Sequence, residues 1–388
     1  MVAEVLGPWA KSFPVSSWGM TAREFLDSEP RRSAFATPLM TIDRGAARHN
    51  VDLMAGWLRE RGLEIAPHGK TTMAPQLWRQ LLDAGAWGIT LATAWQVQVA
   101  RANGIERVLL ANQLIDPVAL RWLATELADP GFGFACWVDG VDTVAAMRSA
   151  LSGVALPRPI DVVVELGGEG GRTGARTVAV AEAVASAVQA APELRLVGVG
   201  GYEGSYGDTR SARHLDAIER YLDDLVDLHD RLAFDDTPIV TAGGSAYFDL
   251  VAEKLGPLVG RATVMLRSGA YQLHDEGFYQ GITPLGGLRS AIHGWARVIS
   301  RPEPGLAILD GGKRDFPYDL GLPTTPAGEV LKVNDQHAYL RGAPELGAVL
   351  RLGLSHPCTA FDKWRLIPVV EDADAADPLV VDLVRTWF

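Results

Sequence analysis

The chain has 388 residues, enough for about two domains at roughly 150 residues each. Its 36 basic and 47 acidic side chains give a formal net charge of −11, and no long basic run occurs, which argues against nucleic acid and anionic membranes as partners. The sequence contains neither a signal-peptide core nor an apolar stretch of about 18 residues. Two cysteines, Cys136 and Cys358, cannot form a disulfide framework. We therefore expect a soluble cytoplasmic protein.

The first predicted strand is "LMTID", residues 39–43, which precedes a helical pattern. We expect this strand to pair with strands near the other end of the chain. Residues 1–45 are accordingly predicted to form an N-terminal segment that joins a C-terminal β domain.

Eight short β-rich runs follow, and they alternate with helical patterns in which apolar residues recur at three- and four-residue spacing. Near-continuous apolar strands that alternate with helices are typical of parallel βα units. Eight such units match a (β/α)₈ TIM-type barrel better than a doubly wound sheet, and we assign residues 46–285 to this barrel. The predicted strands are residues 63–70, 87–93, 107–113, 132–139, 161–168, 196–204, 238–245 and 263–270.

Beyond about residue 285, long helical patterns give way to short strands punctuated by Gly and Pro. Residues 286–388 are therefore predicted to form a compact antiparallel β domain. Near its end, "LSHPCTAFDKW" places His356 and Cys358 two residues apart.

Lys70 ends the first barrel strand, in the segment "PHGK". Catalytic groups of such barrels gather at the carboxyl ends of the strands. A lysine at this place can form a Schiff base with a carbonyl cofactor, because desolvation favours the neutral amine. An ordinary surface lysine after a strand is the alternative interpretation.

Two Gly-rich segments add further candidates. "TAGGS" ends the seventh predicted strand, where Gly243 and Gly244 can present backbone N–H groups to a phosphate. "ELGGEGGRTG" follows the fifth strand and carries Arg172, a permanent cation that can face a pyridine nitrogen. Ordinary turn glycines and an exposed loop arginine are the alternatives. A lysine, a phosphate cradle and an arginine in one barrel together suggest pyridoxal 5′-phosphate.

The order and spacing of these motifs resemble the D-serine dehydratase-like family. That family also contains D-threonine aldolase and has the alanine-racemase-type fold of pyridoxal-phosphate enzymes, fold type III. The resemblance covers roughly residues 35–370. It rests on "TPLMTID", "PHGKT", "ELGGEGGRTG", "GYEGSYG", "TAGGS", "LRSGAYQLHDEG", "LDGGKRDF", "NDQHAYL" and "SHPC".

The resemblance implies a role for each matching residue. The cofactor would be held by a Schiff-base lysine, a ring-contacting arginine, two pocket tyrosines and a phosphate-binding turn, and a divalent metal by the His-x-Cys pair. The implied set is Lys70, Arg172, Tyr202, Gly243, Gly244, Ser245 and Tyr271 for the cofactor, and His356 and Cys358 for the metal.

One position departs from the family pattern. Many relatives carry a histidine two residues after the lysine, whereas this chain has Thr72. The proton handling of that histidine must be performed otherwise here. His68 lies two residues before the lysine, where a structural strand-end histidine is an equal interpretation.

Taken alone, the His-x-Cys pair is a weak metal signature, because two ligands do not fill a coordination shell. A buried free cysteine beside an incidental histidine is the alternative. Cys136 lies in the apolar strand "FGFACWVD" and is predicted to be core, whereas Cys358 lies in a polar loop. An incomplete shell leaves room for water and substrate. The soft thiolate favours zinc over manganese.

The resemblance implies a lyase that acts on a β-hydroxy D-amino acid such as D-serine, with β-elimination to a 2-oxo acid and ammonia. D-threonine aldolase-type retro-aldol cleavage to glycine and an aldehyde is the nearest alternative, although Cys358 and Thr72 favour elimination. An amino-acid racemase would give the metal pair no role, and a non-catalytic pyridoxal-phosphate carrier would need neither that pair nor the β domain. The resemblance also implies a homodimer.

Overall fold

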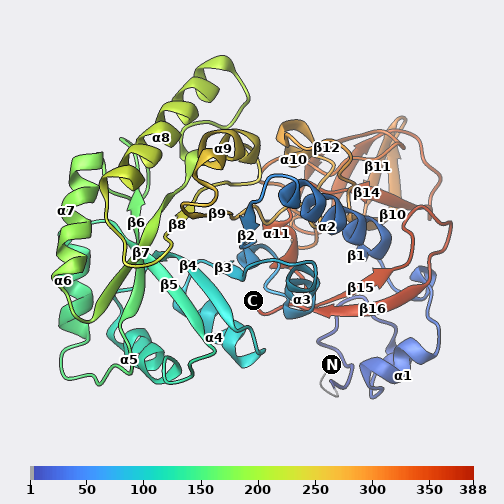
Figure 1. Ribbon diagram of the computed structural model, residues 1–388. Coiled ribbons are helices and arrows are strands. Elements are labelled where there is room, and N and C mark those ends of the chain that lie inside the picture. Colours follow the sequence, from blue (N-terminus) through green and yellow to red (C-terminus); the bar gives the residue numbers. More distant parts are fainter. Residues whose placement is uncertain (1–3) are drawn as a thin grey trace. The chain divides into compact units, whose positions relative to one another are not determined.

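The computed structural model describes residues 4–388, which divide into two compact units (Figure 1). The barrel unit comprises Ala55–Lys70 and Leu81–Gly269. The β unit comprises the described residues up to Met54, together with Thr71–Gln80 and Ala270–Phe388. The domain boundaries after residues 45 and 285 stay predictions. No helix within residues 4–388 is long and apolar enough to cross a membrane.

The barrel unit is built on eight parallel strands in the order β2-β9-β8-β7-β6-β5-β4-β3. A single parallel bridge between His68 and Thr90 joins the two end strands of this curled sheet. Each of the eight strands overlaps one predicted run, although β6 and β7 begin one and two residues earlier, so the expected barrel architecture is confirmed. The strands are β2 (Glu64–Ile65), β3 (Ile89–Leu91), β4 (Arg107–Gln113), β5 (Gly133–Val138), β6 (Ile160–Leu166), β7 (Leu194–Gly201), β8 (Ile239–Thr241) and β9 (Thr263–Leu266).

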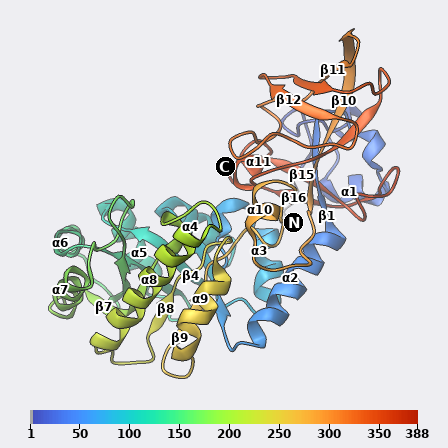
Figure 2. The same ribbon diagram turned by 90° about the horizontal axis from the view of Figure 1, so that it is seen from above.

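Six helices alternate with these strands and cover the outside of the sheet (Figure 2). Strand β6 is buried on both faces over Val162–Val164, because side chains inside the barrel and helices outside it both exclude water. Several helices begin at a side-chain cap, as at Asp116, whose carboxylate accepts the N–H groups of Val118 and Ala119. The helices are α4 (Ala94–Ala102), α5 (Pro117–Glu126), α6 (Val141–Ala150), α7 (Val178–Gln189), α8 (Ala212–Arg231) and α9 (Phe248–Leu255).

The β unit contains a sheet in the order β12-β13-β11-β10-β1-β15-β16, with β14 paired to β10. Its neighbours are antiparallel except for β1 and β15, which run parallel. The N-terminal strand therefore lies in the middle of the C-terminal sheet, as predicted. The strands are β1 (Leu39–Asp43), β10 (Ile292–Glu303), β11 (Leu306–Leu309), β12 (Glu329–Val333), β13 (Ala338–Arg341), β14 (Val349–Gly353), β15 (Leu366–Val370) and β16 (Val380–Arg385).

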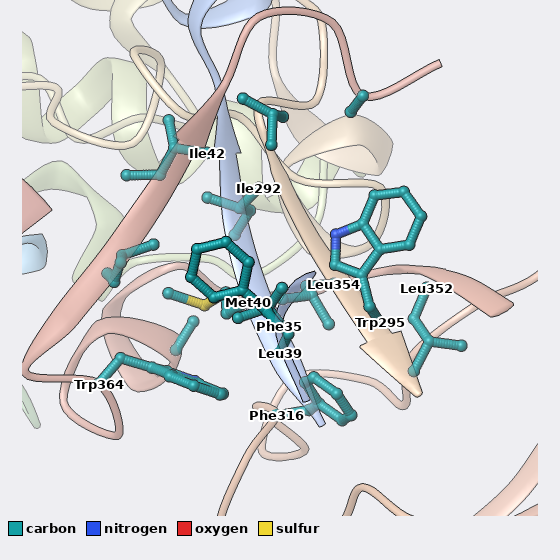
Figure 3. Close-up of a cluster of buried hydrophobic side chains, with 14 of the residues drawn as sticks. Phe35, Leu39, Met40, Ile42, Ile292, Trp295, Phe316, Leu352, Leu354 and Trp364 are labelled. Carbon is teal, nitrogen blue, oxygen red and sulfur yellow. The ribbon is translucent and has the colours of Figure 1, made fainter. Parts of the chain in front are cut away.

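Strand β1 forms the centre of the hydrophobic core of the β unit (Figure 3). All five of its residues are buried, and the indole N–H of Trp295 donates to the Thr41 hydroxyl at 2.9 Å. Leu354, at the exit of β14, is packed into the same core. The buried side chain of Leu354 therefore anchors the start of the loop that carries His356.

Five other α-helices occur within the described residues. Two long ones, α2 (Arg44–Arg59) and α3 (Pro75–Asp83), each contribute residues to both units. The short helices α1 (Ala22–Asp27), α10 (Phe278–Ile282) and α11 (Cys358–Phe361) belong to the β unit, and α11 begins at the cysteine of the predicted metal pair.

Candidate active site

Lys70 lies just beyond β2, in a single 3₁₀ turn over Gly69–Thr71. The chain before it is fixed against β9, because the His68 N–H donates to the Arg267 carbonyl at 3.2 Å. A side chain at Gly269 would place its Cβ 2.6 Å from the His68 carbonyl oxygen. Gly269 therefore allows the segment after β9 to approach His68 closely, and this contact holds Lys70 at the carboxyl end of the sheet.

The surroundings of His68 show that this part of the barrel unit is strongly cationic. Burial lowers the pKa of His68 well below its usual value, and the positive charges of Lys70, Arg267 and Arg172 lower it further. Within the described residues its buried Nδ1 has no hydrogen-bond partner. The His68 imidazole lies among three cations, an environment that suits an anionic ligand.

Arg172 is exposed in the loop after β6, and its guanidinium carbon lies 5.3 Å from the centroid of the Tyr202 ring. Tyr202 follows β7 and is 40% exposed. The loop is held by Arg176, whose guanidinium donates to the carbonyls of Gly168 and Gly171, both at 2.8 Å. The two predicted cofactor residues thus lie together, and Arg176 is a supporting residue that the sequence interpretation missed.

Gly243 and Gly244 lie directly after β8 and are both required to be glycine. Gly243 has φ +101°, and a Cβ on Gly244 would lie 2.9 Å from the Tyr202 ring. Their N–H groups donate to the two carboxylate oxygens of Glu203, at 2.8 and 2.6 Å. Glu203 is fully buried. Ser245 is the next residue of this turn, and the phosphate-binding role of the three residues stays a prediction.

Arg267 is a second buried charge that the sequence interpretation missed. Its guanidinium donates to the Thr241 hydroxyl at 2.7 Å and to the Gly201 carbonyl at 2.5 Å. Burial lowers its pKa, and the nearby negative charge of Glu203 opposes that shift. The isolated charge in the apolar stretch "TVMLRSG" was the signal available in the sequence.

These residues fit pyridoxal 5′-phosphate. The cofactor is an aldehyde with a phosphate group, and the barrel unit offers a lysine amine within a cationic cluster, an exposed arginine and an aromatic ring. Tyr271, the remaining predicted cofactor residue, is buried in the β unit, where burial raises the pKa of its phenol.

His356 and Cys358 lie in the loop between β14 and α11. His356 has a left-handed backbone, φ +54°, and its N–H donates to the Asp275 carboxylate at 3.0 Å. Its side chain makes two further contacts, a hydrogen bond to Cys358 and one from Nδ1 to the Asp319 carboxylate at 2.6 Å. The hydrogen bond to Cys358 and the negative charges of Cys358 and Asp319 raise the pKa of His356 to about 9.

Asp319 is held in place from its other side. Its second oxygen accepts the Thr359 hydroxyl at 2.7 Å, and although partial burial opposes the shift, the hydrogen bonds from Thr359 and His356 lower its pKa. A carboxylate on one imidazole nitrogen orients the other nitrogen toward a metal, so the donor set fits a divalent ion bound by His356 and Cys358. Within residues 4–388, no group of three or more His, Cys, Asp or Glu side chains is arranged to hold a metal.

The residues after Lys70 also belong to the β unit. The Thr71 hydroxyl lies 3.4 Å from the Cys358 sulfur, and Thr72 is buried. The residue that follows the predicted Schiff-base lysine in sequence therefore contacts one of the predicted metal ligands.

The β unit also contains a cavity of about 550 Å³. Among the described residues, its lining includes none of the predicted site residues, but it shares Asp275 with the loop of His356. Buried His274 and His293 line it, and burial lowers the pKa of each to about 4.

Two family models match the chain, the alanine racemase N-terminal domain over residues 42–255 and the putative serine dehydratase domain over residues 291–370. The first covers more than half of the sequence, and the chain belongs to the alanine racemase N-terminal domain family. The order of the two matches agrees with the expected D-serine dehydratase-like resemblance, which is confirmed.

Curated relatives and solved structures agree with this assignment. D-threonine aldolase of Arthrobacter sp. is 26% identical over 356 residues, 88% of this chain and 90% of that protein. 3-Hydroxy-D-aspartate aldolase of Paracoccus denitrificans strain Pd 1222 is 24% identical over 348 residues, 87% and 85% of the two chains. The structure of D-threonine aldolase from Filomicrobium marinum has a TM-score of 0.80 at 23% identity and covers 92% and 97%. D-threo-3-hydroxyaspartate dehydratase from Delftia sp. HT23 has a TM-score of 0.74 at 20% identity and covers 91% and 98%. The match to the alanine racemase N-terminal domain and the likeness to a solved alanine racemase-like structure confirm the alanine-racemase-like fold.

Proposed function

We propose that this chain is a lyase dependent on pyridoxal 5′-phosphate and a divalent metal, and that it catalyses β-elimination of a β-hydroxy D-amino acid such as D-serine. The products would be a 2-oxo acid and ammonia. The arrangement of His356, Cys358 and Asp319 carries this proposal, because a metal beside the substrate hydroxyl is what elimination of that group needs. The names of the relatives support the substrate class.

Each predicted residue has a defined task in this reaction. The cofactor, bound through Lys70, Arg172, Tyr202, Tyr271 and the Gly243–Ser245 turn, would supply an electron sink for charge at the substrate α-carbon. The Lys70 amine would accept the α-proton. Arg172 would face the cofactor ring, and the permanent charge of its guanidinium would keep the ring nitrogen unprotonated.

On the metal side, His356 and Cys358 would hold an ion that supplies Lewis acidity toward the β-hydroxyl group. Asp319 would keep the His356 ring in its ligating orientation. The metal would be zinc, because a thiolate is a soft ligand, with manganese as the second choice. Among the solved structures of D-threo-3-hydroxyaspartate dehydratase, one is a histidine variant and one a cysteine variant in the metal-free form, which supports a His and Cys metal pair.

Retro-aldol cleavage to glycine and an aldehyde is the second candidate. The two curated relatives described above favour it, since D-threonine aldolase and 3-hydroxy-D-aspartate aldolase are both aldolases. Both reactions would use the same lysine and metal, and they differ in whether the β-oxygen leaves or only loses its proton. The presence of Cys358 and Thr72 favours elimination.

The products formed from D-threonine separate the two reactions. Purified protein with pyridoxal 5′-phosphate and zinc should form 2-oxobutanoate and ammonia, whereas an aldolase would form glycine and acetaldehyde. L-Threonine serves as the control and should not react. If D-serine, D-threonine and 3-hydroxy-D-aspartate all fail to give a 2-oxo acid, the elimination proposal is wrong.

Other functions within the same fold predict different results. A racemase would interconvert enantiomers and keep its activity after chelation, and a pyridoxal-phosphate carrier would bind the cofactor at Lys70 without turnover. The resemblance also leads us to propose a homodimer, which light scattering of the purified protein tests. The composition of the sequence leads us to propose a cytoplasmic location, which subcellular fractionation tests.

A further inference from the structure

The side chain of Thr71 is a buried polar group that the proposed chemistry does not use. Thr71 follows Lys70 in the chain and is 3% exposed. Its hydroxyl oxygen lies 3.4 Å from the Sγ atom of Cys358, across 287 positions of sequence. Within the β unit, this contact joins the segment that follows the proposed Schiff-base lysine to a proposed metal ligand.

Both sides of this contact are held by the surrounding β unit. The segment Thr71–Gln80 belongs to that unit, and the Met73 carbonyl within it accepts the Trp387 N–H at 2.8 Å. On the other side, Cys358 begins helix α11, and the loop before it starts at the buried side chain of Leu354. The fold therefore sets the position of the hydroxyl beside the sulfur.

The direction of the hydrogen bond follows from the ionisation of a metal-binding cysteine. Cysteine binds a metal as its thiolate, which has no proton and can only accept a hydrogen bond. The Thr71 hydroxyl is then the donor. A hydrogen bond to an anionic sulfur is charge-assisted, so it stabilises the negative charge and fixes the orientation of the side chain. It also reduces the electron donation from the sulfur to the metal.

We propose that Thr71 is a positioning residue of the metal site, whose hydroxyl donates a hydrogen bond to the Cys358 thiolate and so sets the orientation and donor strength of that ligand. This inference rests on the proposed metal site of His356 and Cys358. Asp319 supports the histidine of the pair, and Thr71 gives the cysteine a partner of its own. Since Thr71 is bonded to Lys70, the segment that carries the proposed cofactor lysine continues into the support of the metal site.

The Thr71→Val variant tests this assignment, because valine nearly keeps the shape of the side chain and removes the hydroxyl. In protein loaded with cobalt(II), a bound thiolate gives a sulfur-to-metal charge-transfer band, which the difference spectrum against zinc-loaded protein isolates from the cofactor. Without its hydrogen bond the sulfur gives up an electron more readily, so the band should move to longer wavelength. The affinity for cobalt(II), titrated on the same band, should fall about tenfold.

Two further variants show whether the hydroxyl itself is responsible. Thr71→Ser restores a hydroxyl at the same position and should return the wavelength and the affinity to the wild-type values. Thr41→Val is the matched control, because Thr41 is another buried threonine of the β unit, and its hydroxyl accepts the Trp295 indole N–H instead. The control should keep the wild-type band. If Thr71→Val does not fold, Thr71→Ala also lacks the hydroxyl and should show the same shift.

The wavelength decides the inference. A variant without the Thr71 hydroxyl whose band stays at the wild-type wavelength would overturn it, even if that variant bound less cobalt(II), because lost stability alone lowers occupancy without moving the band. That result would leave the proposed function intact. A wild-type protein that bound cobalt(II) without the charge-transfer band, or bound none, would instead remove Cys358 from the metal site and overturn the proposed function together with the inference.

Discussion

Two histidines, one in each unit, lie in opposite electrostatic environments. Burial and the charges of Lys70, Arg267 and Arg172 keep the pKa of His68 far below its usual value. The hydrogen bond to Cys358, together with the negative charges of Cys358 and Asp319, raises the pKa of His356 to about 9. The difference fits an anion beside His68 in the barrel unit and a cation beside His356 in the β unit, as a phosphorylated cofactor and a metal ion would require.

Replacement of Lys70 by alanine should have the largest effect of any change in the barrel unit. We expect activity to fall by about 10⁴-fold, because both the covalent anchor and the base are lost, and the visible Schiff-base band to disappear. Lys254→Ala, which removes a lysine from α9, should retain the band and the activity. A Lys70→Ala protein that kept the band would show that another amine holds the cofactor.

Replacement of the proposed metal ligands tests the β unit in the same way. His356→Ala and Cys358→Ala should each lose bound zinc in elemental analysis and about 10³-fold in activity, as chelation should in the wild type. The Schiff-base band should persist in both variants, because the cofactor residues are unaltered. His337→Ala, which replaces an exposed histidine, is the control and should keep both zinc and activity. Retention of stoichiometric zinc in both variants would place the metal elsewhere.

Asp319→Asn tests the metal site more finely, because both proposed metal ligands stay in place. An amide accepts a weaker hydrogen bond from the His356 ring and carries no charge, so we expect metal affinity to fall by about 10–100-fold. Competition titration with a zinc indicator measures this change. Asp362→Asn, on an exposed carboxylate that follows α11, should bind zinc like the wild type. Equal affinities for the two variants would remove Asp319 from the site.

The smallest expected effect concerns buried His293. Burial and the charge of Arg351 lower its pKa to about 4. Below its unfolded pKa of about 6.5, the unfolded chain binds a proton that the folded chain does not, so stability falls as the pH drops toward 4, by about 2 kcal/mol at pH 5. In His293→Gln, the free energy of unfolding, measured with denaturant at pH 7 and pH 5, should differ less between the two pH values than in the wild type, by about this amount. His337→Gln should keep the wild-type difference, and an unchanged value in His293→Gln would contradict the assignment.

The sequence predicted the fold because apolar periodicity is a local property. Each barrel strand is a short apolar run, and a two-residue strand such as β2 was located by its place in the alternation. The position of β1 was likewise foreseen, since an isolated strand before a barrel needs a partner. The parallel pairing of β1 with β15 carried no such local signal.

The supporting residues of the site were not predictable in this way. Glu203 bonds to residues 40 and 41 positions away, and Asp319 lies 37 positions before His356. Such contacts join loops after different strands, so no spacing rule links them. The residues proposed from sequence, Lys70 and the His356–Cys358 pair, are those whose chemistry is contained in a short motif.

The central place of β1 also has a consequence for synthesis. The Asp43 carboxylate at the end of β1 accepts the Ala373 N–H at 2.7 Å, across 330 positions of sequence. A ribosome must therefore reach residue 292 before β1 can pair with β10 and residue 366 before it can pair with β15, whereas every strand of the barrel unit is complete by residue 269. Until then, the nascent chain exposes the apolar strand β1 without a partner, while the sheet of the barrel unit can already assemble. Residues 39–43 are therefore a segment that a chaperone would bind.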